Sequence, residues 1–153
     1  MKQATSYTLT AKRLALAIVH GLLLMGLTGC DNWRETAGDL AGMWQLAQWR
    51  DNATHEVIRT QSDQIYYCVQ RQLIKFQDGR HSAHYYLSYY TRTRDAIVLS
   101  TIIEYPADTI VTDLTTLTEQ FAVPADKCFN VELLDDHRLL LTTERATLSF
   151  RKY

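Results

Sequence analysis

The stretch Leu40-Ala41-Gly42-Met43-Trp44-Gln45-Leu46 marks where the folded part of this 153-residue chain begins. From there to the end of the chain, short runs rich in Val, Ile, Tyr, Thr and Phe alternate with turn residues, at the spacing typical of consecutive β-strands. No amphipathic helix of four turns interrupts these runs. Together, these runs predict one all-β domain, residues 40–153.

The alternation predicts about eight strands, at residues 43–50, 55–60, 64–76, 81–91, 96–103, 128–134, 138–143 and 147–153. Asp78-Gly79 supplies the left-handed residue that a tight hairpin turn requires, so residues 64–76 and 81–91 are expected to pair antiparallel. Polar breaks at residues 135–137 and 144–146 predict that the last three strands form a meander.

Side chains two residues apart on a strand face the same side, which identifies the expected core. In the last three strands this predicts inward positions at Phe129, Val131, Leu133, Leu139, Leu141, Leu148 and Phe150. Residues 105–127, which contain Pro106 and Pro124, depart from the β pattern. We predict that they form a connecting lid with one helical turn, in which Asp113 caps and Leu114, Leu117 and Phe121 share one side.

The first 29 residues have the order of an export signal. Residues 1–13 are polar and basic, residues 14–27 are apolar apart from His20, and two small residues follow. The apolar run of about a dozen residues is shorter than the roughly 20 that a membrane-spanning helix needs. We therefore expect residues 1–29 to be removed as a signal peptide.

Leu27-Thr28-Gly29-Cys30 resembles the lipobox of bacterial lipoproteins. The resemblance implies that Cys30 becomes the first residue, carries a thioether-linked diacylglycerol, and receives an acyl chain such as palmitate on its amino group. Residues 30–39 would then be a short tether, and the domain would be lipid-anchored in the cell envelope, outside the cytoplasm. The alternative is an ordinary cysteine after a conventional cleavage site. Asp31 does not decide between the inner and the outer membrane.

Charge and cysteine content narrow the class of protein further. Without the signal segment the chain keeps 13 Lys and Arg against 17 Asp and Glu, a net charge of about −4, and the basic residues are scattered, which argues against a nucleic-acid partner. Cys68 and Cys128 remain as an even pair in an oxidising compartment, which favours a disulfide. Two unpaired thiols are the alternative.

The Gly42-x-Trp44 motif in the first strand, followed by about seven more strands, resembles the lipocalin, or calycin, pattern. The chain also resembles small bacterial lipocalin-like lipoproteins that end, as here, in Phe150-Arg151-Lys152-Tyr153. The resemblance implies an up-and-down antiparallel β-barrel of about eight strands. It also implies that Trp44 packs across the closed end of the barrel with Arg151 over its ring, a pair that gains cation–π attraction.

Motifs for catalysis, cofactors and metals are not visible. The sequence contains no G-x-S-x-G, no H-E-x-x-H and no Gly-rich phosphate loop, so we expect neither an enzyme nor a cofactor site. His81 and His84 lie three residues apart, so on a strand they would point to opposite faces, and we expect no metal site there.

Tyrosines dominate several of the predicted strands. Tyr67, Tyr85 and Tyr89 are our candidates for lining a pocket for a small apolar ligand, because tyrosine combines apolar area with a hydroxyl. Ordinary cross-strand packing is the alternative. The functional hypothesis is a membrane-anchored, non-catalytic binding module for a small apolar ligand or an envelope protein. A structural or interaction protein with a filled barrel is the second hypothesis.

Overall fold

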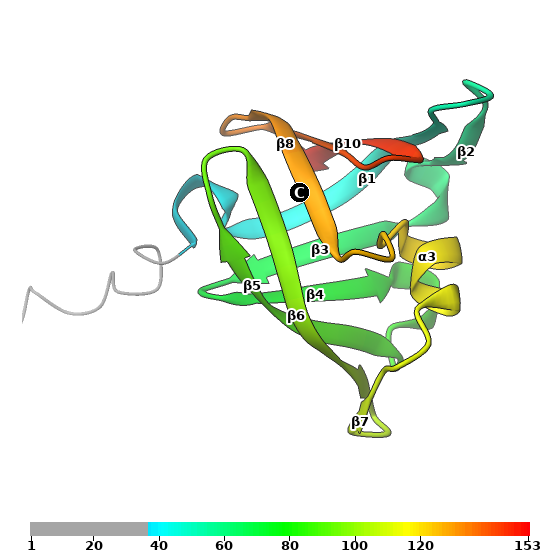
Figure 1. Cartoon of the computed structure of the whole chain (residues 1–153), viewed down its shortest axis with the longest axis vertical. Helices are drawn as coiled ribbons and strands as arrows, with labels where there is room; N and C mark the ends of the chain where they lie inside the picture. The colour runs from blue at the N-terminus through cyan, green and yellow to red at the C-terminus, as the bar shows by residue number, and fades with distance from the viewer. Residues whose placement is uncertain (1–36) are drawn as a thin grey trace, which may run out of the picture. The chain divides into compact units, whose positions relative to one another are not determined.

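The computed structural model describes residues 37–153, which form an antiparallel β-barrel (Figure 1). The signal segment 1–29, Cys30 and the tether up to residue 36 lie outside the described residues. Three short 3-10 turns, η1 (Gly38–Leu40), η2 (Gln61–Asp63) and η3 (Gly79–His81), and one helix, α3 (Thr115–Phe121), join the strands. The strands are β1 (Gly42–Asp51), β2 (Val57–Thr60), β3 (Ile65–Gln70), β4 (Leu73–Asp78), β5 (Tyr85–Arg92), β6 (Ala96–Tyr105), β7 (Thr109–Ile110), β8 (Cys128–Leu134), β9 (Arg138–Thr142) and β10 (Ala146–Lys152).

Eight of the described strands make the barrel wall, in the order β1, β3, β4, β5, β6, β8, β9 and β10. Each pairs antiparallel with its neighbour in this order, and β10 pairs back onto β1 to close the ring. The short strands β2 and β7 add to β1 and β6 outside this ring. The predicted all-β, up-and-down barrel of about eight strands is therefore confirmed, and so is its C-terminal meander.

The single strand predicted at residues 64–76 is wrong. The segment is a hairpin, in which β3 and β4 meet at a two-residue turn formed by Arg71 and Gln72. Arg71 has a φ of 54°, which is a left-handed conformation. Such turns are usually predicted from Gly or Asn, and neither residue is present at this turn. As a result only β4 pairs with the strand that follows, β5, while β3 pairs with β1.

Gly79 is needed for a different reason than predicted. Its φ is not positive, and the connection to β5 runs through η3 rather than through a two-residue turn. Steric space requires glycine at this position, because a Cβ atom on Gly79 would come within 2.8 Å of the Tyr66 ring carbon Cε2. Glycine therefore permits the loop to pass over a tyrosine side chain.

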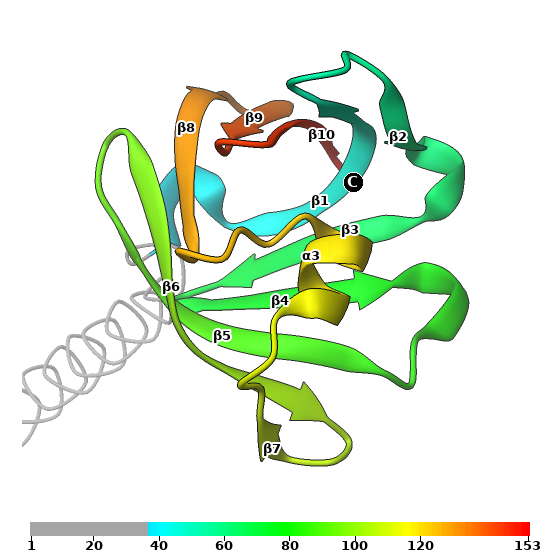
Figure 2. The same ribbon diagram turned by 45° about the vertical axis from the view of Figure 1, so that its right-hand side comes forward.

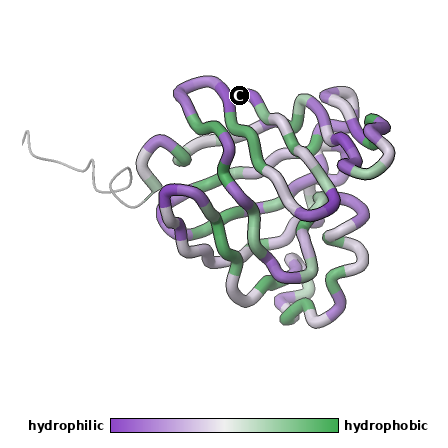
Figure 3. Tube along the Cα trace, turned by 45° about the horizontal axis from the view of Figure 1, so that its top comes forward, coloured by the Kyte–Doolittle hydropathy of each residue, from purple (hydrophilic) through white to green (hydrophobic). Residues whose placement is uncertain are grey.

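Hydrophobic residues recur along the strands, and many of the connecting loops are hydrophilic (Figure 3). The predicted inward positions Phe129, Leu139, Leu141, Leu148 and Phe150 are all buried. Val131, also predicted to face inward, is only partly buried against the core. Leu133 is the exception, since a β-bulge between Val131 and Leu133 shifts the register and turns Leu133 to solvent. Leu134 packs against the core instead.

The two ends of the barrel differ in how they are covered. At one end, η1 precedes β1 and the tight turns after β3, β5 and β8 converge; we call this the closed end. At the other end, which we call the mouth, the long segment 106–127 carries α3 across the opening (Figure 2). The lid contains the predicted helix, and Leu117 and Phe121 are buried on its inner side. The predicted cap is wrong, because the N-cap residue is Leu114; Asp113 lies one residue earlier and accepts hydrogen bonds from the Thr115 backbone N–H and hydroxyl.

Candidate functional site

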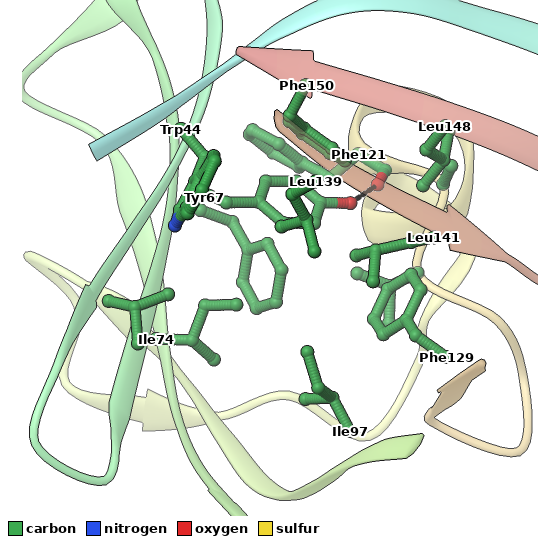
Figure 4. Close-up of a cluster of buried hydrophobic side chains, with 14 of the residues drawn as sticks. Trp44, Tyr67, Ile74, Ile97, Phe121, Phe129, Leu139, Leu141, Leu148 and Phe150 are labelled. Atoms are coloured by element: carbon green, nitrogen blue, oxygen red, sulfur yellow. Dashed lines mark hydrogen bonds between the residues drawn. The ribbon is translucent and has the colours of Figure 1, made fainter. Parts of the chain in front are cut away.

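The barrel interior is filled by side chains, and Tyr67 stands at its centre (Figure 4). The Tyr67 ring is 1% exposed and lies 4.6 Å from the Phe150 ring and 4.8 Å from the Phe76 ring, centroid to centroid. Phe129 and Phe121 complete the ring cluster at 6.1 Å from Tyr67 and Phe76, respectively. Tyr67 is therefore a core residue that occupies the space where an interior ligand would sit.

The Tyr67 hydroxyl also holds the lid. It donates a hydrogen bond to the backbone carbonyl of Phe121, the last residue of α3. Burial raises the pKa of Tyr67 far above the ordinary value, so the phenol stays protonated and keeps its donor. One buried side chain of the barrel wall thus satisfies a helix-end carbonyl that otherwise lacks a partner within the helix.

The other two predicted pocket tyrosines face outward, so the three-tyrosine pocket does not form. On β5 the inward side chains are Ser88 and Tyr90, which are buried. Tyr85 stacks on Tyr105 on the outer surface, with ring centroids 4.5 Å apart, and Tyr89 is 58% exposed. Aromatics occur on both faces of this strand, so the sequence alone does not distinguish them.

The closed end is sealed by Trp44, which is fully buried and donates from its indole N–H to the Leu40 carbonyl at 2.8 Å. The predicted partner of its ring is wrong. Lys152, not Arg151, lies over Trp44, with Nζ 4.8 Å from the ring centroid. The register of β1 and β10 explains this, because it sets Trp44 opposite Lys152 and Gln45 opposite Arg151.

Arg151 lies on the other face of the same strand pair. Its guanidinium donates to Gln45 Oε1 from Nε at 3.1 Å and from Nη2 at 2.8 Å. Gly42, the first residue of the G-x-W motif, holds a φ of 132°, which favours glycine. The motif thus combines a glycine-dependent strand entry with the tryptophan that closes the barrel.

The predicted disulfide between Cys68 and Cys128 is also wrong, and both thiols are free. Cys68 belongs to β3 and Cys128 to β8, which are four strands apart in either direction around the eight-stranded wall. Their neighbours Tyr67 and Phe129 point inward, so both cysteines face outward from opposite sides of the barrel. Burial raises the pKa of the Cys68 thiol.

A groove of about 850 Å³ lies at the mouth, outside the filled interior. Three segments form it: the ends of β1 and β2, α3 with the residues after it, and the turn between β9 and β10. Its apolar lining consists of Trp49, Ile58, Leu114, Ala122, Val123, Pro124, Ala125 and Ala146. Its charged lining consists of Asp51, Asp113, Glu119, Asp126, Glu144 and Arg145. A volume in this range, with apolar walls and a polar rim, is typical of small-molecule sites.

Hydrogen bonds from neighbouring residues lower the pKa of two of the rim carboxylates. The N–H groups of Thr54 and Ala53 donate to Asp51 and lower its pKa. The hydroxyl of Thr115 does the same for Asp113, and the Thr115 backbone N–H adds to it. Hydrogen bonds to the charged form are one of the causes that lower a carboxyl pKa. Both groups therefore carry negative charge at neutral pH.

The sequence did not identify this groove. It predicted a lid at residues 105–127, but the groove also requires residues 49–58 and 143–146, which pattern analysis does not bring together. A second hollow of about 510 Å³ lies on the outer surface over β1, β9 and β10, and its lining includes Gln48, Arg50, Asn52 and His55. Polar side chains predominate there, so the mouth groove is the better candidate for an apolar ligand.

The two histidines considered as a metal pair contact different carboxylates. His81 Nδ1 lies 3.3 Å from Asp78, and His84 Nδ1 lies 3.5 Å from Glu104. Between residues 37 and 153, no group of three or more His, Cys, Asp and Glu side chains is placed to hold a metal ion. Over the same residues, no helix is long and apolar enough to cross a membrane.

A closed up-and-down barrel with G-x-W in its first strand and a covered mouth defines a lipocalin-like protein. The chain belongs to the family described as the lipocalin-like domain, whose model matches residues 24–153. It is similar to the structure of a lipocalin-like protein from Bacteroides uniformis, with 27% identity and a TM-score of 0.56, over 76% of this chain and 100% of that chain. An uncharacterized protein from Bacteroides eggerthii, at 22% identity and a TM-score of 0.53 over 74% of this chain and 98% of that one, shares the fold. Comparison with curated proteins gives no match.

Proposed function

We propose that this chain is a lipid-anchored, extracytoplasmic, non-catalytic binding protein whose ligand site is the mouth groove. The lipocalin-like fold suggests a module for a small ligand. One observation carries the assignment to the groove: the interior is occupied by Tyr67 and its ring cluster, while about 850 Å³ remains open beside α3. A small apolar ligand would lie against the apolar lining there and leave the core undisturbed.

The proposed anchor rests on the lipobox ending in Cys30. One acyl chain holds a protein to a bilayer only marginally, whereas two or three chains hold it stably. Metabolic labelling with a palmitate analogue tests this directly: the wild-type chain should carry label and fractionate with membranes. Cys30→Ala should abolish both, and labelling that persists in this variant overturns the anchor. Cys68→Ala is the matched control and should leave labelling unchanged.

The groove is tested with the full chain by native mass spectrometry of protein purified from its own membrane. A retained small molecule is expected on the wild type. Ala125→Trp should reduce its occupancy, because Ala125 lines the groove and is exposed, so that a larger side chain fills space without entering the core. Ala53→Trp is the control, since Ala53 is exposed at the same end and does not line the groove. Equal occupancy in the two variants contradicts the assignment.

A second candidate, an interaction protein of the envelope, is favoured by the outer face of β5, β6 and β7. Cross-strand pairs there join Tyr85 to Tyr105 and Ile103 to Ile110, and Tyr89 and Ile110 are well exposed. Contiguous exposed apolar side chains mark protein contacts in many proteins. A photo-crosslinker at position 89 should then give one defined adduct in intact cells, and the same group at Ser149, on the outer face of β10, should not.

A further inference from the structure

We propose that the mouth groove takes a cation that carries an apolar body, rather than a neutral or an acidic apolar molecule. The inference rests on the proposed function, because it names the ligand class of the same groove. Two properties of the lining carry it: its apolar wall and the sign of the charges around that wall.

The apolar wall is continuous with the lid. Val123 and Ala122 are buried directly after α3, Leu114 is half-buried directly before it, and Trp49 faces them from β1. Ile58 of β2 is 48% exposed at the outer edge. A ligand that covers these side chains removes apolar surface from water, which is the source of affinity for its hydrocarbon part.

The charges of the rim are strongly unequal. Five carboxylates line the groove, and Arg145 is the one Lys or Arg side chain among the lining residues of the described chain. Arg59 lies nearby on β2, but its guanidinium is directed to Asp63 at 3.6 Å and to the Glu119 carbonyl at 3.4 Å. A cationic group at this rim is attracted by several charges at once, whereas an anion is repelled by them.

Two of the five carboxylates, those of Glu119 and Glu144, accept no hydrogen bond from the described residues. Asp51, Asp113 and Asp126 each have one oxygen engaged by backbone N–H groups. The side chains of Glu119 and Glu144 are exposed. These two residues stand on different walls of the groove, in α3 and in the β9–β10 turn. We assign to them the contact with the cationic group.

Three water-soluble probes of equal chain length separate the alternatives: octyltrimethylammonium, octanol and octyl sulfate. Each is titrated into the full chain held in nanodiscs of neutral phosphatidylcholine, and methyl NMR shifts of Leu114 and Val123 report binding. Leu46 and Leu139, which are buried in the barrel, serve as reference methyls that partitioning into lipid does not move. The ammonium probe is expected to bind at least about tenfold more tightly than octanol and to weaken as salt is added.

Substitutions of the charged lining residues test which of them cause the preference for the ammonium probe. Glu119→Gln with Glu144→Gln should weaken the ammonium probe about tenfold and leave octanol unchanged, whereas Arg145→Gln should strengthen it. Glu56→Gln, at the same end but outside the groove, is the matched control. Equal or tighter binding of octanol or octyl sulfate overturns the charge preference and leaves the groove as the ligand site. If none of the probes shifts the groove methyl resonances, the assignment of the groove as the ligand site is wrong, and the proposed binding function is contradicted with it.

Discussion

The closed end and the mouth of this barrel contain similar residues, but these residues differ in burial and in contacts. Each end has a tryptophan on β1: Trp44 is fully buried and hydrogen-bonded, whereas Trp49 is half-buried and borders a groove. Exposed side chains of both signs, such as Arg94 and Asp95, lie in the closed-end turns, whereas the lining of the mouth groove contains five carboxylates and one arginine. The closed end therefore has its tryptophan sealed inside the core, whereas the mouth, although α3 packs onto the same core, leaves surface beside Trp49 that a ligand can reach.

The difference also bears on how the domain would sit on a membrane. The described chain enters the barrel at the closed end, where Ala37 and Leu40 are buried, and Arg92 pairs with Asp39 at 2.6 Å. The anchor that we propose at Cys30 would hold this end toward the lipid. The acidic mouth, one strand length away along β1, would then face away from an anionic surface.

The largest expected effect separates the two tryptophans. Trp44→Ala should lower the free energy of unfolding by about 3–5 kcal/mol, because it leaves a cavity at the sealed end of the core. Trp49→Ala should cost roughly 1 kcal/mol, since its side chain is only partly buried. Urea denaturation measures both values. A loss for Trp49→Ala as large as that for Trp44→Ala contradicts the division between the ends.

Two tyrosine hydroxyls offer the next comparison. Tyr67→Phe should cost about 1–3 kcal/mol, because the Phe121 carbonyl is left without its partner in a buried site. Tyr90→Phe removes a hydrogen bond of 2.8 Å to the Arg71 carbonyl, at the closed end. Amide hydrogen exchange should therefore accelerate in α3 only for the first variant and in the β3–β4 turn only for the second. Faster exchange in α3 for both variants means that the ends are not independent.

Lys152 and Arg151 test how the closed end is sealed. Lys152→Met keeps the aliphatic stem but removes the cation over Trp44, and should cost about 0.5–2 kcal/mol. The variant should also shift the fluorescence of Trp44, measured in a chain in which the other two tryptophans are Phe. Arg151→Met should leave that fluorescence unchanged, because Arg151 contacts Gln45 on the opposite face. A spectral shift from Arg151→Met alone would mean that Arg151, and not Lys152, lies over the ring.

Local patterns predicted most of this fold. Period-two alternation located the inward residues of β9 and β10, and the spacing of Pro106 and Pro124 located the lid. The errors arose where a regular strand is interrupted, by a bulge or by a chain reversal. The bulge at Leu133 exposes a predicted core residue, and the turn at Arg71 divides one predicted strand into two. Neither position carries Gly, Asn or Pro, the residues that mark such irregularities in a sequence.

The candidate site was harder to predict than the fold, because it depends on register and on distant segments. Whether Arg151 or Lys152 reaches Trp44 is decided by a shift of one residue in the pairing of β1 with β10. The cysteines are kept apart by their places around the barrel, which no spacing in the sequence encodes. The groove joins residues from three segments, and its carboxylates are separately unremarkable surface residues.

The smallest expected effect is a pH dependence at the closed end. The hydrogen bond from Arg92 is the main cause that lowers the pKa of Asp39 below its ordinary value of 3.8. Because the folded value is the lower one, this contribution is complete above the ordinary value and is lost as the pH falls through the folded value. The pair is partly exposed, so we expect only about 0.2–1 kcal/mol.

Asp39→Asn should therefore reduce the loss of unfolding free energy at acid pH by about 0.2–1 kcal/mol. Asp95→Asn, in the neighbouring turn, removes an ion pair with Arg94 that is 4.0 Å long and almost fully exposed, and should leave this loss unchanged. Urea midpoints between pH 2.5 and 6 measure the difference. If Asp95→Asn reduces the loss as much as Asp39→Asn, general surface charge and not the Arg92 contact causes the pH dependence.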